Sequence, residues 1–490
     1  MKRISKPFII ALSSAALLLG SCTKDFVDHN TNPNASTVAS PQSLLAPTLV
    51  TTINNNLNRN FRLNNEFMQV TVTTINSREF HRYIVRPSEA DYSWRNWYRQ
   101  LTNIRDIYNK AEEGQLAGFE TFKGISRILD AWVGSLLTDM YGDVPYLGSN
   151  LGYLEQNITP EFDKQKDIYA SIFDKLHEAD TLLSKNINLP NDVVFSDPIY
   201  NGEALKWRKF GNALRLRLLM RVAHTGEFDA VAKIKEMVDI APQDYPLFDN
   251  NEESATLIFS GENPFQNQFH NARDYDFNGD KGYSEFFINN FLELQDPRLP
   301  ILATEATLGV YSGMQSGYAQ GVIPQRESTL PLALKTDGRL GNILNYAEQQ
   351  FLLAEAALNG YIQGNPTDYY NQGVVGAMDY WGVEEFQPEE YLLNPKANLD
   401  QAANYQDKLE RIHLQKFYAM LFTDFQQWYE YRRTRALNLY QGIGLGNNGQ
   451  MPSRLNYPIL TRTFNYENYQ KAVESMGGDS LNEKVWWEKN

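Results

Sequence analysis

The sequence predicts a mainly α-helical fold, an array of paired helices interrupted by long irregular insertions. Two observations support this prediction. Apolar residues recur at spacings of three and four over much of the chain, as they do on the buried face of a helix. Two stretches, at about 241–344 and 382–405, lack this periodicity and exceed the usual length of a connection. We therefore interpret them as loop-rich insertions in a helical scaffold.

The N-terminal residues predict export and attachment to a membrane. Residues 1–21 have the form of a signal peptide, in which basic residues precede an apolar stretch too short for a permanent transmembrane helix. Residues 19–21 lead into Cys22, the only cysteine among 490 residues, in a pattern that resembles the bacterial lipoprotein processing box. We expect Cys22 to become the acylated N-terminus that anchors the chain. The alternative is an ordinary cleaved signal followed by an incidental cysteine.

The composition after Cys22 indicates a tether and then one large domain. Residues 22–40 are rich in polar and turn-forming residues, as expected of a flexible tether. Residues 41–490 contain no obvious linker, so we expect a single helical domain with an irregular tail from 436. The net charge of −14 becomes more negative when the basic signal peptide is removed, which argues against a nucleic acid partner.

Helical spacing is clearest near the start of this domain. Large apolar residues recur every three or four positions over 97–108 and 125–140. The second of these segments is expected to end at Tyr141-Gly142-Asp143-Val144-Pro145, where a glycine is followed by a proline. Further helices are expected at 164–184, 203–224, 228–239, 345–360, 367–381 and 406–435.

One of these segments indicates how the helices pair. Trp207, Phe210, Gly211 and Leu214 approximate the spacing of a tetratricopeptide helix. Pairs of such helices stack into a right-handed array. The predicted fold is therefore a right-handed array of tetratricopeptide-like helix pairs, without a strict repeat.

Three arginines follow on the same segment. Arg215, Arg217 and Arg221 are spaced so that at least two share one face of the helix. We expect them to pair with carboxylates of a neighbouring helix. Leu414, Phe417, Leu421, Phe425 and Trp428 form an aromatic and aliphatic stripe on the segment 406–435, and this pattern is typical of a core.

The sharpest local pattern for metal binding lies within the first insertion. Five oxygen-bearing residues follow the spacing of a calcium loop, with Gly279 at the sharp turn: Asp274, Asp276, Asn278, Asp280 and Glu285. Against calcium, Lys281 occupies a position that is usually aliphatic, and no clear helix precedes the loop. The alternative is a solvated acidic turn before a helix over 285–295, in which Ser284 is the cap.

Several segments, in order, resemble the SusD/RagB family of nutrient-binding lipoproteins, in particular its second, SusD-like branch. They lie behind the lipoprotein signal and spread over nearly the whole chain. The segments are Tyr141 to Tyr146; Gly211 to Arg217; Asp296-Pro297-Arg298-Leu299; Tyr346-Ala347-Glu348 with Ala354-Glu355-Ala356; Gln415-Lys416 with Glu430 to Thr434; Arg454 to Pro458; and Gly477-Gly478-Asp479 with Trp486-Trp487.

The resemblance implies both an architecture and a partner. It implies four tetratricopeptide-like helix pairs whose irregular insertions form a binding face. It also implies an outer-membrane location facing the cell exterior, and a SusC-type TonB-dependent transporter that the chain covers as a lid. The ligand implied is an oligosaccharide, or a peptide in some members, and no cofactor is required beyond a structural calcium if one is bound.

Candidate ligand residues are those with the chemistry that sugars need. Aromatic rings stack on pyranose faces, while amides and guanidinium groups hydrogen-bond hydroxyls. Loop-rich clusters with this composition are His81, Arg82, Tyr83, Trp94 and Asn96; Phe265, Gln268, His270, Asn271 and Arg273; and Tyr311 with Tyr318. For each of these residues, loop packing or contact with the transporter is the alternative.

The sequence contains no pattern that indicates catalysis. It has no HExxH, P-loop, CxxC or GxSxG motif, and its six histidines are scattered without metal-ligand spacing. The resemblance to nutrient-binding lipoproteins implies a binding protein and not an enzyme. Two alternatives remain: a surface glycoside hydrolase with two carboxylates across a cleft, and an interaction scaffold without a small-molecule ligand.

Overall fold

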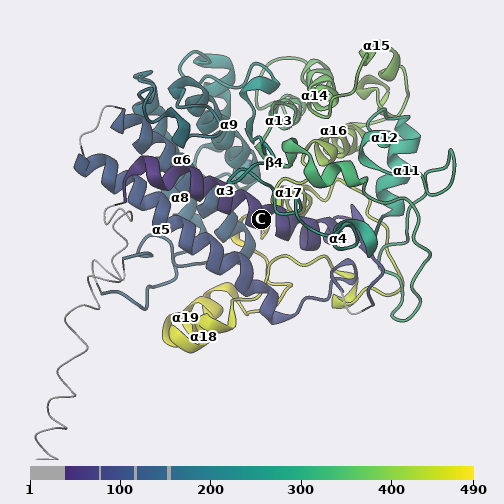
Figure 1. Cartoon of the computed structure of the whole chain (residues 1–490), viewed down its shortest axis with the longest axis horizontal. Coiled ribbons are helices and arrows are strands. Elements are labelled where there is room, and N and C mark those ends of the chain that lie inside the picture. Colours follow the sequence, from purple (N-terminus) through teal and green to yellow (C-terminus); the bar gives the residue numbers. More distant parts are fainter. Residues whose placement is uncertain (1–38, 77–78, 115–117, 152–155, 490) are drawn as a thin grey trace, which may run out of the picture. The chain divides into compact units, whose positions relative to one another are not determined.

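The computed structural model describes residues 39–76, 79–114, 118–151 and 156–489, and they are mainly helical, as predicted (Figure 1). Residues Pro41–Asn490 form one compact unit. Cys22 and most of the predicted tether lie outside the described residues. Within the described ranges, no helix has both the length and the apolar character that crossing a membrane requires.

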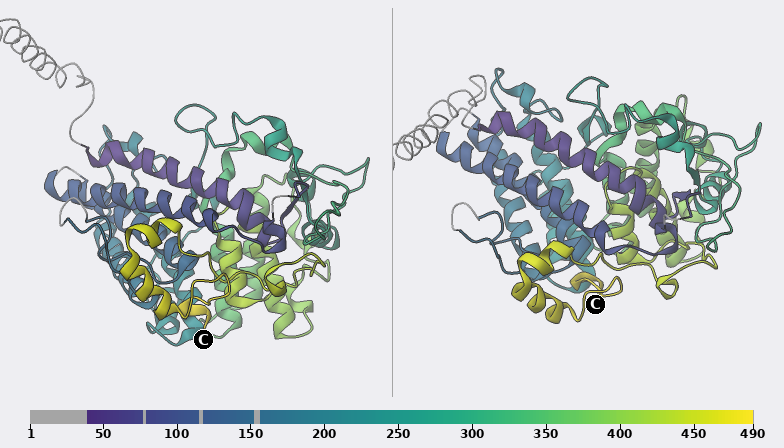
Figure 2. Two further views of the ribbon diagram at one scale, coloured as in Figure 1. Left: turned by 90° about the horizontal axis from the view of Figure 1, so that it is seen from below. Right: turned by 60° about the horizontal axis from the view of Figure 1, so that its bottom comes forward.

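The first half of the unit consists of helices that pack against their neighbours in sequence. Figure 2 shows two of them, α3 and α5, running side by side. The helices are α3 (Pro41–Arg59), α4 (Asn65–Phe67), α5 (Ala90–Gly114), α6 (Phe119–Tyr141), α8 (Gln165–Leu183), α9 (Ala204–Val222) and α10 (Ala230–Lys235). As predicted, α6 ends at Tyr141, and Gly142 follows at a φ of 82°, a conformation that favours glycine.

The second half contains shorter helices and one of two small antiparallel sheets, and the other sheet pairs a strand of the first half with a strand of the second. Strand β1 (Thr71–Thr73) pairs with β3 (Lys281–Tyr283), and β2 (Ala255–Leu257) pairs with β4 (Gly341–Leu344). The helices are α11 (Glu285–Leu294), α12 (Leu299–Leu302), α13 (Tyr346–Leu358), α14 (Pro366–Tyr380), α15 (Pro388–Tyr391), α16 (Tyr405–Ala419), α17 (Gln426–Thr434), α18 (Ile459–Phe464) and α19 (Tyr466–Met476). The sheets join segments that are distant in sequence.

The predicted helix at 406–435 was wrong in one respect, because it is two helices. The chain leaves the helical conformation between α16 and α17, where Phe422 and Asp424 have φ values of 63° and 27°. The buried Asp424 carboxylate accepts hydrogen bonds from the amide of Phe425 and, at 2.9 Å, from the side chain of Gln426. This local bonding starts α17 in a new direction, which the continuous aromatic stripe did not reveal.

Two further predictions need correction at the ends of the domain. The tail from 436 is not wholly irregular, because it contains α18 and α19. Helix α3 was not expected, since Pro47 and a run of asparagines obscure its apolar spacing. Pro47 is tolerated inside α3, whose buried face still carries Leu45, Leu49 and Ile53.

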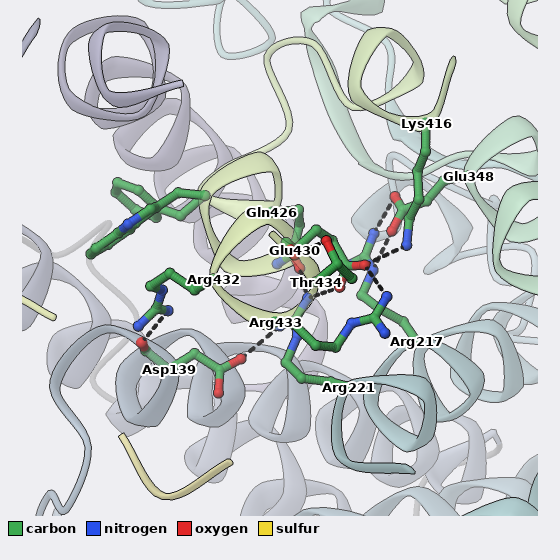
Figure 3. Close-up of polar contacts among 12 residues, drawn as sticks. Asp139, Arg217, Arg221, Glu348, Lys416, Gln426, Glu430, Arg432, Arg433 and Thr434 are labelled. Atoms are coloured by element: carbon green, nitrogen blue, oxygen red, sulfur yellow. Dashed lines mark hydrogen bonds and ion pairs between the residues drawn. The ribbon is translucent and has the colours of Figure 1, made fainter. Parts of the chain in front are cut away.

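Buried charges join the helices of the two halves (Figure 3). As predicted, two of the three arginines on α9 pair with carboxylates of neighbouring helices. Arg217 forms a bidentate pair with Glu348 of α13, with both N–O distances 2.7 Å. Arg221 binds Asp139 of α6 at 2.6 Å and Glu430 of α17 at 3.1 Å. Arg215, the third, instead lies 5.1 Å from the centre of the Tyr245 ring.

Glu430 is the centre of this network. Its carboxylate accepts from Lys416 of α16 and from Arg433, each at 2.7 Å, in addition to Arg221. Burial alone would raise its pKa, but Arg433, Lys416 and Arg221 outweigh burial and hold the pKa well below the ordinary range. Arg433 also binds Glu355 of α13 through two N–H groups at 2.7 Å. The network therefore ties five helices together.

Removing the Glu430 carboxylate should strongly destabilise the fold. Glu430→Ala would leave buried cations without their counter-charge, so we expect the free energy of unfolding to fall by about 3–5 kcal/mol. Denaturant unfolding followed by circular dichroism measures this change. Lys110→Ala, which breaks an exposed pair with Glu113, is the control and should leave the unfolding midpoint unchanged. Similar midpoints for both variants would contradict the role given to the network.

Candidate functional site

Three of the predicted ligand residues come together, but inside the protein. His81 stacks on Tyr318 with ring centroids 4.5 Å apart, and the Arg82 guanidinium lies 5.8 Å from the centre of the same ring. Their exposed fractions are 2% or less. The amide of Gly317 donates to Nδ1 of His81 at 3.2 Å, and the hydroxyl of Tyr318 donates to the carbonyl of Thr73 at 2.8 Å. These contacts hold the loop before α5 against the loop at 311–321.

The remaining predicted residues lie apart from one another. Along the first insertion, Phe265 is half-buried against the core, whereas Arg273 is exposed and paired with Asp276 at 2.7 Å. Tyr83 is buried beneath a separate polar pocket that also contains Arg435. The other residues are Gln268, His270, Asn96 and Tyr311, which are half-buried, and Asn271, which is exposed.

The residues of the predicted calcium loop do not converge on one point. Asp274 pairs with Lys335 at 2.9 Å and Asp276 pairs with Arg273, so two of the five are already engaged by basic side chains. Asn278 lies in a π-helical turn (Tyr275–Gly279), Asp280 is buried at its end, and Glu285 begins α11. Ser284 caps α11 by accepting from the amide of Phe287, as predicted. Calcium binding stays a prediction that this arrangement does not favour.

A different group of side chains has the composition of a metal site. Among the described residues, Glu355, His413 and Glu430 are the one set of three or more such groups whose ligand atoms lie within 4.8 Å of one another. Arg433 donates to both carboxylates at 2.7 Å. Because a guanidinium already supplies the positive charge there, we assign this group to the buried ion network and not to metal binding.

One predicted residue, Trp94, lines an open pocket of about 220 Å³, which we call the Trp94 pocket. The pocket forms between α5, the segment after α6, and α18 with the following Asn465. Figure 2 shows the C-terminal helices in yellow near α5, although the two segments are distant in sequence. Its lining combines aromatic rings, amides and small polar groups: Trp94, Tyr98, Pro145, Ser149, Asn150, Asn157, Ile158, Pro160, Phe162, Leu460, Thr461, Phe464 and Asn465.

Aromatic rings form the floor and rim of the Trp94 pocket. Trp94 is 6% exposed and packs on Tyr98 and Phe162, with centroid distances of 4.8 and 6.3 Å. Phe464 and Ile158 stand at the rim with 74% and 81% of their surface exposed. Both side chains line the same pocket, so their exposed apolar surfaces lie close together. The rim therefore offers an apolar platform that a ligand can cover.

Amides surround these rings and are held in place by the backbone. Asn150 donates to the carbonyl of Tyr98 at 2.9 Å, and Asn465 donates to the carbonyl of Pro160 at 2.6 Å. The side-chain oxygen of Asn150 accepts from the hydroxyl of Ser149 at 2.8 Å, and that of Asn465 accepts from the amide of Asn468 at 3.0 Å. Among the described residues that line the pocket, none is charged. An uncharged set of rings and amides suits a neutral polyhydroxylated ligand, whose hydroxyls need hydrogen bonds and whose C–H faces need apolar contact.

Sequence reasoning found Trp94 but missed most of the pocket. Phe162 and Asn157 follow α6 in a stretch without helical periodicity, and Phe464 and Asn465 lie in the tail that was expected to be irregular. The available signal was the cluster Phe464-Asn465-Tyr466, which places aromatic and amide side chains next to one another. Nothing local in the sequence pairs this cluster with α5.

Comparison with known proteins gives a consistent family. The family model described as "Starch-binding associating with outer membrane", a SusD-like family, matches residues 33–458. No curated protein matches the chain.

Solved structures match over almost their whole length. A chitin-binding protein is 26% identical, with a TM-score of 0.77 over 92% of this chain and 99% of its own. A SusD homologue from Bacteroides fragilis is 24% identical, with a TM-score of 0.78 over 92% and 99%. A chitin-binding SusD homologue from Flavobacterium johnsoniae is 22% identical, with a TM-score of 0.79 over 91% and 98%. The last two establish similarity of fold.

The buried His81 should make stability depend on pH. Burial, with Arg82 and Lys281 nearby, lowers the pKa of its imidazole to about 3 from the ordinary 6.5. Between these values the unfolded chain binds a proton that the folded chain does not, so the free energy of unfolding falls as pH falls. In His81→Gln this contribution is absent. Unfolding curves from about pH 7 to about pH 4.5 should show wild type losing stability relative to the variant. A difference in the free energy of unfolding that stays constant with pH would contradict this role of His81. The matched control is His177→Gln, which changes an exposed histidine of α8.

Proposed function

The chain belongs to the SusD-like family of starch-binding proteins that associate with the outer membrane, and from this premise we propose that it captures a neutral oligosaccharide at the cell surface. The Trp94 pocket is the site that we assign to capture. The observation that carries this assignment is its lining of aromatic and amide side chains without a charged residue among those described. The chitin-binding descriptions of two similar structures are consistent with a glycan ligand.

The same lining favours a glycan over a peptide. A peptide brings charged termini and often charged side chains, and each would lose hydration in the pocket without gaining a counter-charge. A neutral sugar loses only hydroxyl hydration, which amides such as Asn157 and Asn465 replace with hydrogen bonds. A peptide-binding role is therefore the second candidate, and a selective peptide signal without a glycan signal would establish it.

The pocket also supports capture without cleavage. Glycoside hydrolysis ordinarily needs two carboxylates on either side of the scissile bond, one as the acid and the other as base or nucleophile. No carboxylate lines the Trp94 pocket among the described residues. We therefore propose that a bound oligosaccharide is released intact, and chromatography of the ligand after incubation with the purified protein tests this.

Shortening the exposed ring at the rim should weaken glycan binding. Phe464→Ala removes a stacking surface that is 74% exposed, so the fold should persist while affinity falls about tenfold, equivalent to about 1.4 kcal/mol. Calorimetry with the best neutral glycan from an array screen measures the change, using the mature chain with Cys22→Ala. Trp94 is a poorer target because its burial confounds binding with folding.

Phe195→Ala is the matched control for this experiment, because Phe195 is 71% exposed and lies outside the pocket. Equal affinity of both variants would show that the glycan binds elsewhere. The absence of measurable binding to any neutral glycan would contradict the proposed function itself.

We also propose that Cys22 anchors the chain by lipid and that the chain delivers its ligand to a SusC-type transporter. Both proposals rest on the lipoprotein pattern and on the family, and not on the described residues. Cells expressing Cys22→Ala should lose incorporation of labelled palmitate and release the protein from outer membranes, because a thiol is needed for acylation. Detergent extracts of wild-type outer membranes should contain the protein bound to a TonB-dependent barrel. A palmitate label that persists in the variant would contradict anchoring at Cys22.

A further inference from the structure

A second open groove lies along the helix pair α13 and α14. Its volume is about 640 Å³, and we call it the α14 groove. One face of α14, the start of α13, and the segment at α15 enclose it, and Figure 1 shows these three helices next to one another. Its lining is Asn250, Asn251, Tyr346, Asn371, Gln372, Val375, Gly376, Asp379, Pro388, Glu389 and Leu392. No residue is shared with the Trp94 pocket.

The aromatic ring of the α14 groove is fixed against a helix backbone. Tyr346 is half-buried at the first turn of α13. A Cβ at Gly376 would meet the Tyr346 ring at 2.9 Å, so the ring lies directly over α14 where that helix has no side chain. The hydroxyl of Tyr346 donates to the side-chain oxygen of Gln372 at 3.3 Å. The ring is thereby a preformed platform and not a mobile surface side chain.

The amides around this ring retain free hydrogen-bonding groups. The side chain of Asn371 has no hydrogen-bond partner among the described residues, although it is only partly exposed. Gln372 accepts from Tyr346, which leaves its NH₂ group available. Asn251 donates to the carbonyl of Gly376 at 2.8 Å and to Asp379 at 2.7 Å, yet its own side-chain oxygen is buried without a donor. A buried acceptor of this kind is costly unless a ligand or water satisfies it.

The charge of the groove restricts its ligand further. Its described lining contains two carboxylates, Asp379 and Glu389, and no lysine or arginine. An anionic glycan would meet like charge and no counter-ion. A neutral sugar instead finds both donors and acceptors, with apolar contact from Tyr346, Val375 and Leu392.

We propose that the α14 groove is a second binding site for a neutral oligosaccharide, separate from the Trp94 pocket. This inference rests on the proposed function, because it assigns the same class of ligand to another face. Two sites on one chain allow a long polysaccharide to be held at two points, and the second contact then forms at high effective concentration. Weak individual sites are sufficient for capture under these conditions.

Photo-crosslinking on the full mature chain with Cys22→Ala distinguishes the two sites. The probes are diazirine derivatives of maltoheptaose, cellohexaose and chitohexaose, with an oligogalacturonate as the anionic comparison. Peptide mapping should find neutral probe on segment 366–392 as well as around the Trp94 pocket. The oligogalacturonate should label neither α14 nor α15.

Variants assign the label to named side chains. Asn371→Ala with Gln372→Ala should reduce labelling of 366–392 about tenfold and leave the Trp94 pocket labelled, because only hydrogen bonds in the groove are lost. Phe464→Ala should reduce labelling around the Trp94 pocket and leave 366–392 labelled. Tyr346→Ala removes the platform. Tyr369→Ala, which changes a half-buried tyrosine of α14 outside the groove, is its control for folding.

The outcomes separate this inference from the proposed function. Neutral label confined to the Trp94 pocket, or label on 366–392 that survives the double variant, overturns the α14 site and leaves the function intact. Label confined to 366–392 supports the α14 site and removes the assignment of the Trp94 pocket. Absence of label from all three neutral probes overturns both proposals.

Discussion

The charge network around Glu430 is the interaction on which the rest of the structure depends. It places Arg221, Lys416 and Arg433 within hydrogen-bond distance of one carboxylate, and all four side chains are at most 8% exposed. Buried charges are favourable only when each finds its partner in good geometry. A shifted helix would leave an unpaired charge in the core, so the network selects one packing of α6, α9, α13, α16 and α17. Apolar packing alone tolerates more arrangements.

The network also determines where the Trp94 pocket forms. Asp139, which binds Arg221, accepts from the indole of Trp487 at 2.7 Å. Its carbonyl accepts from Arg432 at 2.6 Å, and the same arginine donates to the carbonyl of Ser453. The C-terminal segment is thereby tied to the end of α6. This segment continues into α18, whose residue Phe464 lines the same pocket as Trp94 of α5. The contacts of Asp139 and Arg432 therefore help to hold the C-terminal segment that contributes to the Trp94 pocket.

Prediction from the sequence succeeded where the signal is local. Apolar spacing located α5, α6, α8 and α9, and the spacing of Arg217 and Arg221 correctly indicated ion pairs. It failed where tertiary contacts decide. Residue type marked His81 and Tyr318 as ligand contacts, yet strand pairing between β1 and β3 and the loop at 311–321 buries them. Phe464 and Trp94 are far apart in sequence, and no local pattern predicts that they line the same pocket.

The distribution of charge supports the proposal that the Trp94 pocket and the α14 groove take neutral ligands. This chain places part of its charge in the buried network and exposes much of the rest, with a net charge of −14. The described lining of the Trp94 pocket contains no charged residue. The only charged residues in the described lining of the α14 groove are carboxylates. An anionic ligand would therefore be repelled at a distance by the net charge and would find no counter-ion at either site. The proposed selectivity for neutral glycans therefore rests on the absence of basic side chains from both described linings as much as on the rings and amides that they present.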